Sequence, residues 1–244
     1  MILILLLPHC ATTQSQIESR QRGEAHYKLG VSFLNEGKTQ QAFIEFQKAI
    51  SLNPSDKESY NALGLIYEWN FERFDEAEKA YKKAISLDKN FSDAHNNLGV
   101  LYAKLKRWNE AIEEYKMALS NPLYSTPHLA YNNLGFALYS KGNPLDAINA
   151  YRAALKIQPD FDLAYYNLAL SYIKLGMMKE TISSLEMAVR ITPDFLDAHY
   201  QLGIAYLKED KKEPAYHSFK KVIELAPKSE QAISSQVYLE LLGR

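Results

Sequence analysis

The apolar positions of this chain recur at helical spacing and in repeating blocks. Within each block they fall at i, i+3, i+4 and i+7, which places them on one face of an α-helix. A leucine followed by a small residue marks every block, and three positions after the small residue comes an aromatic or another leucine. The pairs are Leu29-Gly30, Leu63-Gly64, Leu98-Gly99, Leu134-Gly135, Leu168-Ala169 and Leu202-Gly203. A period of about 34 residues with this pattern predicts an all-α chain built from repeated helix pairs.

The second helix of each block has its own large residue, with small residues before and after it. These large residues are Phe46, Tyr81, Tyr115, Tyr151, Leu185 and Phe219. Small residues let two helix axes approach, and large side chains fill the space beside them. A proline closes four of the blocks, at Pro54, Pro159, Pro193 and Pro227. Since one block cannot bury its own apolar face, the core must form where neighbouring blocks stack.

This arrangement resembles the tetratricopeptide repeat (TPR) over residues 23–229. The resemblance implies a right-handed superhelix of six helix–turn–helix repeats. The expected repeats are 23–56, 57–91, 92–127, 128–161, 162–195 and 196–229. Residues 230–244 read as an amphipathic helix that caps the last repeat, as the ends of solenoids require. The 17 tyrosines of the chain are then mostly core residues.

Residues 1–22 are expected to be a leader followed by a polar tether. The apolar run from Ile2 to Leu7 is followed closely by Cys10, the only cysteine of the sequence. This order is typical of a bacterial lipoprotein signal, in which the cysteine is lipidated. The run is shorter than the usual apolar region of about 7–15 residues, and no Lys or Arg precedes it. The alternative is therefore a frayed N-terminus with a chance cysteine.

Composition argues against several other classes of protein. The formal net charge is −1, and basic and acidic residues are interspersed, so neither nucleic acid nor an anionic membrane surface is the expected main partner. The six histidines do not cluster, and no nucleophile is paired with a base. His95 and His199 take a position that holds tyrosine in other repeats, which indicates packing residues. We therefore expect no catalysis, no metal site and no cofactor.

Amides on the first helix of successive repeats are the candidate functional feature. They fall at the fifth and sixth positions of the repeat, which face the concave groove in TPR arrays. An amide offers donors and an acceptor, so a ladder of amides could pair with the backbone of an extended peptide. The alternative is that the amides only solvate the groove wall. The predicted peptide-binding groove comprises Asn61, Asn96, Asn97, Asn132, Asn133, Phe136, Tyr139, Tyr166, Asn167, Leu170 and Gln201.

The junction between the third and fourth repeats gives a more specific resemblance. The segment from Ala118 to Pro127, with its Leu123-Tyr124 pair, is similar to a linker of the type IV pilus biogenesis lipoproteins. These TPR pilotins help the outer-membrane secretin to assemble and keep pili stable. The resemblance implies a lipid at Cys10, the periplasmic face of the outer membrane, and a secretin or another pilus component as partner. The alternative is a generic TPR adaptor or co-chaperone in envelope assembly, export or a cytoplasmic complex.

Overall fold

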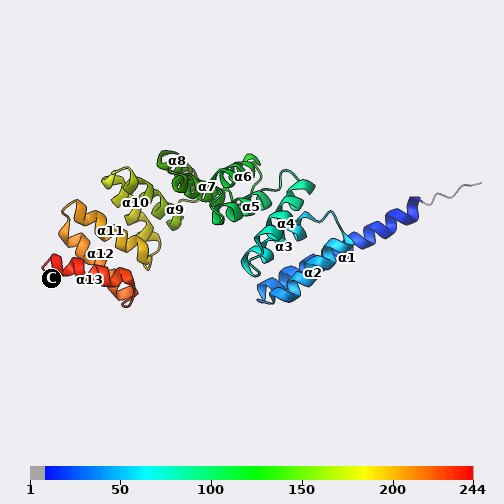
Figure 1. Ribbon diagram of the computed structural model, residues 1–244, viewed down its shortest axis with the longest axis horizontal. Helices are drawn as coiled ribbons and strands as arrows, with labels where there is room; N and C mark the ends of the chain where they lie inside the picture. The colour runs from blue at the N-terminus through cyan, green and yellow to red at the C-terminus, as the bar shows by residue number, and fades with distance from the viewer. Residues whose placement is uncertain (1–8, 244) are drawn as a thin grey trace, which may run out of the picture. The chain divides into compact units, whose positions relative to one another are not determined.

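The computed structural model describes residues 9–243, and all regular structure within that range is α-helical. The prediction of an all-α chain is confirmed. The helices fall into two compact units, and the boundary lies between Tyr124 and Ser125. We call them the N-terminal and the C-terminal unit (Figure 1). The N-terminal unit contains α1 (His9–Asn35), α2 (Thr39–Leu52), α3 (Lys57–Trp69), α4 (Phe74–Leu87), α5 (Ser92–Lys104) and α6 (Trp108–Ser120).

The C-terminal unit continues the alternation of paired helices. It contains α7 (Pro127–Lys141), α8 (Pro144–Ile157), α9 (Asp162–Lys174), α10 (Met178–Ile191), α11 (Leu196–Lys208), α12 (Lys212–Leu225) and α13 (Glu230–Leu241). In both units each helix packs on the one before it and the one after it. We call the first helix of each pair helix A and the second helix B. Each unit is thus a short stack of antiparallel pairs.

Helix α1 is much longer than the other helices, with 27 residues. It begins at His9 and passes through Gly23, where the first repeat was expected to start, without a break. The segment expected to be a polar tether is therefore helical from His9 onward. The apolar run from Ile2 to Leu7 and the side chain of Cys10 lie outside the described part of the structure. Helix α1 thus extends beyond the first repeat without a break.

Several helix ends have a local cause in the sequence. Asp56 caps α3, where its carboxylate accepts a hydrogen bond from the backbone N–H of Ser59 at 3.3 Å. Ser229 caps α13 in the same way through the N–H of Ala232 at 3.1 Å. Both bonds satisfy an N–H that the helix itself leaves unpaired. Helix α7 ends at Gly142, whose φ of 98° is left-handed and suits glycine.

In all helix pairs but the fifth, the core is a ring packed directly on a glycine. A Cβ added to Gly64 would lie 2.4 Å from the ring of Tyr81, and one added to Gly99 would lie 2.6 Å from the ring of Tyr115. Both rings are almost fully buried. Only a missing side chain lets the helices come this close. The same contact occurs at Gly30–Phe46, Gly135–Tyr151 and Gly203–Phe219.

In the fifth repeat, helix A packs on helix B through different side chains. Its helix A has Ala169 at the glycine position, and its helix B has Leu185 where the other repeats have an aromatic ring. Both side chains are fully buried in one cluster. A methyl group is accommodated here because the facing side chain is smaller. The chain thus contains two matched ways to pack helix A on helix B.

The last helix, α13, packs on α12 as each helix A packs on the preceding helix B (Figure 1). Its inner face buries Ala232, Ser235 and Leu239. The ring of Tyr238 stacks on Phe219, with centroids 4.8 Å apart and 16° between the planes. Helix α13 therefore covers α12, as expected of a capping helix.

One carboxyl lies in the core of the N-terminal unit. Glu68 on α3 is 0% exposed, and Tyr81 donates a hydrogen bond to its Oε2 at 3.0 Å. No partner reaches its Oε1 within the described residues. Burial raises the pKa of Glu68, because the charged form loses its water, and the bond from Tyr81 offsets this only in part.

Candidate functional site

The amides predicted to line a groove pair with one another between successive helices A. In the N-terminal unit, Asn97 on α5 donates from Nδ2 to Oδ1 of Asn61 on α3, at 3.0 Å. In the C-terminal unit, Asn167 on α9 donates from Nδ2 to Oδ1 of Asn132 on α7, also at 3.0 Å. In both pairs the sixth residue of a repeat donates to the fifth residue of the repeat before it. The structure therefore shows that these amides tie neighbouring repeats together.

Pairing uses only part of the hydrogen-bonding capacity of each amide. An asparagine has two N–H donors and an oxygen that accepts twice, so one bond leaves at least half of these groups for another partner. Asn132 is 5% exposed, whereas Asn61, Asn97 and Asn167 are half-buried. Each bond also fixes the orientation of the amides that it joins. Such a pair is a pre-oriented hydrogen-bonding group on the wall of the stack.

The remaining predicted groove residues lie on the same helices. Asn96 on α5, Asn133 on α7 and Gln201 on α11 are half-buried. Phe136, one turn after Asn132 and Asn133 on α7, is 47% exposed. The exposed ring of Phe136 thus lies on the same helix as two of the amides.

The aromatic and aliphatic members of the set are partly covered by their own neighbours. The ring of Tyr166 lies 5.0 Å from that of Phe195, centroid to centroid. Lys174 Nζ lies 4.8 Å from the centroid of Tyr139. Leu170 is half-buried on α9. The C-terminal unit thus brings amides, rings and one cation onto three helices A.

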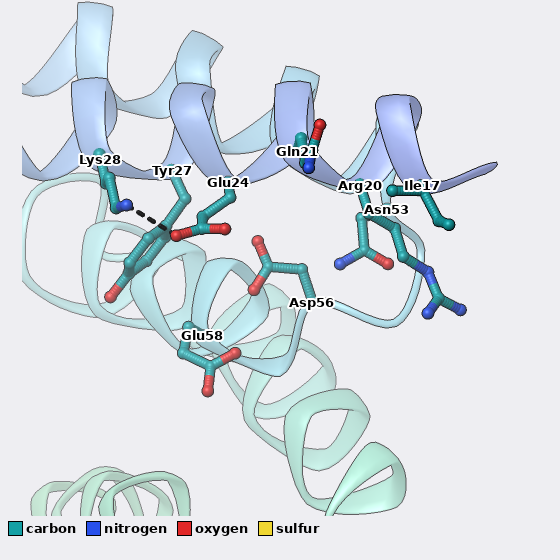
Figure 2. Close-up of a pocket in the computed structure, with 9 residues that line it drawn as sticks. All are labelled: Ile17, Arg20, Gln21, Glu24, Tyr27, Lys28, Asn53, Asp56 and Glu58. Carbon is teal, nitrogen blue, oxygen red and sulfur yellow. Dashed lines mark ion pairs between the residues drawn. The ribbon is translucent and has the colours of Figure 1, made fainter. Parts of the chain in front are cut away.

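A cavity in the N-terminal unit was missed by the reasoning from sequence. It has a volume of about 460 Å³ and lies between α1, the turn before α3 and the first turn of α3 (Figure 2). Its polar side chains include an ion pair of 2.6 Å between Lys28 and Glu24. The lining residues are Ile17, Arg20, Gln21, Glu24, Tyr27, Lys28, Asn53, Asp56 and Glu58.

Tyr27 and Glu58, which both line this cavity, have raised pKa values. Tyr27 stands one repeat before Asn61, so the first repeat has a phenol where the second, third and fourth repeats have an amide. Burial raises the pKa of Tyr27, and nearby carboxylates, Glu58 first among them, raise it further. Burial also raises the pKa of Glu58, and the neighbouring Asp56 adds to the effect. Glu58 therefore holds its charge at a cost beside this cavity.

His95 is buried, as a packing residue should be, but it is also fully hydrogen-bonded. Its Nε2 lies 3.0 Å from the backbone oxygen of Lys89, and its Nδ1 lies 2.6 Å from Oε2 of Glu114 on α6. Both ring nitrogens face acceptors, so the ring must carry two protons to satisfy them. Burial is the largest influence on the pKa of His95 and lowers it, but the hydrogen bonds to Glu114 and Lys89 and the charges of Glu114 and Asp88 together outweigh burial, so the pKa is raised.

The helix pairs described above match known families along most of the chain. Profiles described as "TPR repeat" and "Tetratricopeptide repeat" match residues 23–56, 45–79, 72–106, 92–121, 137–176, 163–195 and 196–229. The chain belongs to the tetratricopeptide-repeat family. The glycine–ring contacts and the paired helices are thus those of TPR units.

Among relatives, this TPR chain is similar to the type IV pilus assembly protein PilF of Pseudomonas aeruginosa. The two are 27% identical over 134 residues, which is 55% of this chain and 53% of PilF. The chain thus matches about half the length of this curated relative. The match to the solved structure of PilF covers 91% of this chain and 99% of the PilF chain in that structure, with a TM-score of 0.80 and 20% identity.

Two further solved TPR structures are similar. One is PilW, described as a widely conserved type IV pilus biogenesis factor. The match covers 89% of this chain and 98% of the PilW chain, with a TM-score of 0.78 and 20% identity. The other is MamA, for which the match covers 68% of this chain and 95% of the MamA chain, with a TM-score of 0.62 and 31% identity. The chain is thus a TPR protein related at low identity to pilus biogenesis factors.

Residues 9–243 contain no group of three His, Cys, Asp or Glu side chains placed to hold a metal ion. No helix among the described residues is long and apolar enough to cross a membrane.

Proposed function

We propose that this TPR chain is a non-catalytic scaffold that binds an extended segment of another protein along its helices A. The amide pairs carry this proposal. Helices in contact lie about 8–10 Å apart, and an extended peptide advances about 3.3 Å per residue. About three peptide residues therefore span one repeat, and within each unit the amide pair could meet a backbone group of such a peptide. The exposed ring of Phe136 offers apolar contact beside the pair of Asn132 and Asn167.

We further propose that the bound segment belongs to a type IV pilus component, with an outer-membrane secretin as the first candidate. The similarity to PilF and PilW supports this assignment. A pilotin-like role also fits a lipid at Cys10, which would hold the scaffold at the periplasmic face of the outer membrane. One acyl chain anchors only marginally, whereas several on one cysteine anchor firmly.

Site-specific photo-crosslinking tests the groove and its occupant together. A photoreactive phenylalanine analogue replaces Phe136 in cells that make pili. Leu145 on α8, which is 65% exposed and outside the predicted groove, receives the same analogue as the matched control. We expect a crosslink to a pilus component from position 136 and none from position 145. Equal crosslinking from both positions would refute the groove as the binding face.

Deleting the gene tests the pilotin role separately. We expect fewer secretin multimers on unheated gels, and recovery when the wild-type chain is restored. If the multimers stay intact, the pilotin role is wrong, and a crosslink from position 136 to a different protein would then favour the generic adaptor. Mass spectrometry of the purified chain decides the anchor. We expect an acylated N-terminus at Cys10, and an unmodified chain that keeps Met1 would favour the cytoplasmic alternative.

A further inference from the structure

The outer face of α13 is apolar, which is unusual for the end of a solenoid. Ile233, Val237 and Leu241 are 63%, 52% and 78% exposed. They are spaced by four residues, so they form one stripe along the helix. Terminal repeats normally turn a polar face to water. We call these three residues the α13 stripe.

The register of the repeat shows what would normally cover such a stripe. One repeat earlier, on α11, the same positions are His199, Gly203 and Leu207. Gly203 lies against the ring of Phe219 on α12, and Leu207 packs in the same cluster. In a complete repeat this face is therefore buried by helix B. Helix α13 is a helix A without a helix B after it in the described structure.

We propose that the α13 stripe docks an amphipathic helix of another protein, which takes the place that helix B has in the other repeats. The site continues the helix-on-helix packing that runs through the C-terminal unit, and it is separate from the proposed groove. Val237 stands where complete repeats have glycine or alanine, so it leaves no room for an aromatic ring. The partner helix therefore presents leucine or a smaller side chain at the crossing.

Charge defines the partner helix further. Glu230 and Glu240 are exposed near the two ends of the stripe. An antiparallel partner with Lys or Arg near both of its ends would pair with them. A second copy of α13 would instead bring more carboxylates to the contact. Three side chains on one helix also offer much less than the ~800 Å² per partner that a stable dimer buries.

Helix α10 of this same chain provides a probe of the required kind. It is the helix B that packs on an alanine-containing helix A, through Leu185. It has Lys179 near its start and Arg190 near its end. The probe is a fluorescent peptide with the sequence of Met178–Ile191, held helical by a side-chain link on its outer face. A second peptide with the sequence of α6, Trp108–Ser120, has Tyr115 at the crossing and serves as the mismatched probe.

The experiment measures fluorescence anisotropy of each peptide with the full chain. We expect saturable binding of the α10 peptide, weakened tenfold or more by Val237→Lys. Leu145→Lys changes a leucine on α8 that is 65% exposed and outside the α13 stripe, and it should leave binding unchanged. The α6 peptide should bind at least tenfold more weakly than the α10 peptide. Circular dichroism of both variants verifies that the fold is kept.

Two results would overturn the proposal. One is no saturable binding of the α10 peptide, or binding that Val237→Lys leaves intact. The other is that the chain itself forms a dimer in sedimentation experiments and that Val237→Lys abolishes the dimer, since a second copy would then be the occupant. Neither result bears on crosslinking from Phe136, so the groove proposal would stand or fall separately.

Discussion

Replacing Gly99 by alanine would place one methyl group in the most tightly packed part of the third repeat. The new Cβ would lie 2.6 Å from Cε1 of Tyr115 and 2.8 Å from Cδ1. Real Cβ atoms do not approach a ring this closely, so the ring or the helix must move. Tyr115 is 2% exposed, so its ring has no open space to move into. The methyl group must therefore separate α5 from α6.

The magnitude follows from two opposing terms. Alanine in a helix interior is favoured over glycine by about 1 kcal/mol. Overpacking a filled core typically costs about 1–3 kcal/mol, and a contact below 3 Å with a buried ring belongs at the upper end. We therefore expect Gly99→Ala to lower the free energy of unfolding by about 1–2 kcal/mol.

The fifth repeat indicates the compensating change. Ala169 is tolerated there because Leu185 faces it. Tyr115→Leu alone should cost about 2–3 kcal/mol through the cavity that it leaves. Combined with Gly99→Ala, it should cost less than the sum of the two single changes. We expect a favourable coupling of about 1–2 kcal/mol, within the range for residues in direct contact.

Urea unfolding followed by circular dichroism measures all three variants. Gly23→Ala on α1 is the matched control, because its Cβ would lie 3.2 Å from Asn53 Cβ and from Ala49 O. The free energy of unfolding of Gly23→Ala should stay within about 0.5 kcal/mol of wild type, because the higher helix propensity of alanine offsets a mild steric contact. A Gly99→Ala variant as stable as wild type, or single losses that simply add, would refute the packing argument.

Three further changes test charges and amides, each by urea unfolding. Asn167→Ala removes the donor to the buried Oδ1 of Asn132 and should cost about 1 kcal/mol; no loss would mean that water replaces the bond. Because the pKa of His95 is higher in the folded chain than in the unfolded chain, protonation of the ring stabilises the fold at a pH below the unfolded pKa. This stabilisation is lost as the pH rises through the folded pKa. Glu114→Gln should therefore cost more at pH 5.5 than at pH 8.5. The raised pKa of Glu68 has the opposite effect on stability. A buried acid costs stability as the pH rises above the pKa that the acid has in the unfolded chain. The free energy of unfolding of Glu68→Gln, relative to wild type, should therefore rise between pH 4.5 and 7.5. A difference in stability that stays constant with pH would contradict the buried charge.

The sequence was sufficient to predict the helix pairs and their core, because both depend on local patterns. Gly99 and Tyr115 lie sixteen residues apart in a repeat whose period is visible by eye, so their contact could be inferred. The same register placed Asn97 and Asn167 on helices A. It could not show that they bond to Asn61 and Asn132, because that bond depends on how far successive helices A are rotated.

Other features lie where the repeat pattern ends. The cavity beside Tyr27 needs the extra turns of α1, which come before the first repeat and follow no period. Helix α13 was expected only to cap the stack. Its sequence shows apolar residues on two faces, and only the packing on α12 tells which face is buried and leaves Val237 outside. Repeat patterns thus predict the interior of a solenoid better than its ends.

The continuous helix α1 also sets the mechanics of attachment for a scaffold held by its N-terminus. A flexible tether would let the repeats wander over any direction within its reach. A helix rises about 1.5 Å per residue, so the stretch from His9 to Gly23 is a rod of roughly 20 Å. A lipid on Cys10 would therefore hold the first repeat about the length of this rod from the anchor. Force on a bound segment would then reach the anchor through a stiff lever rather than a slack chain.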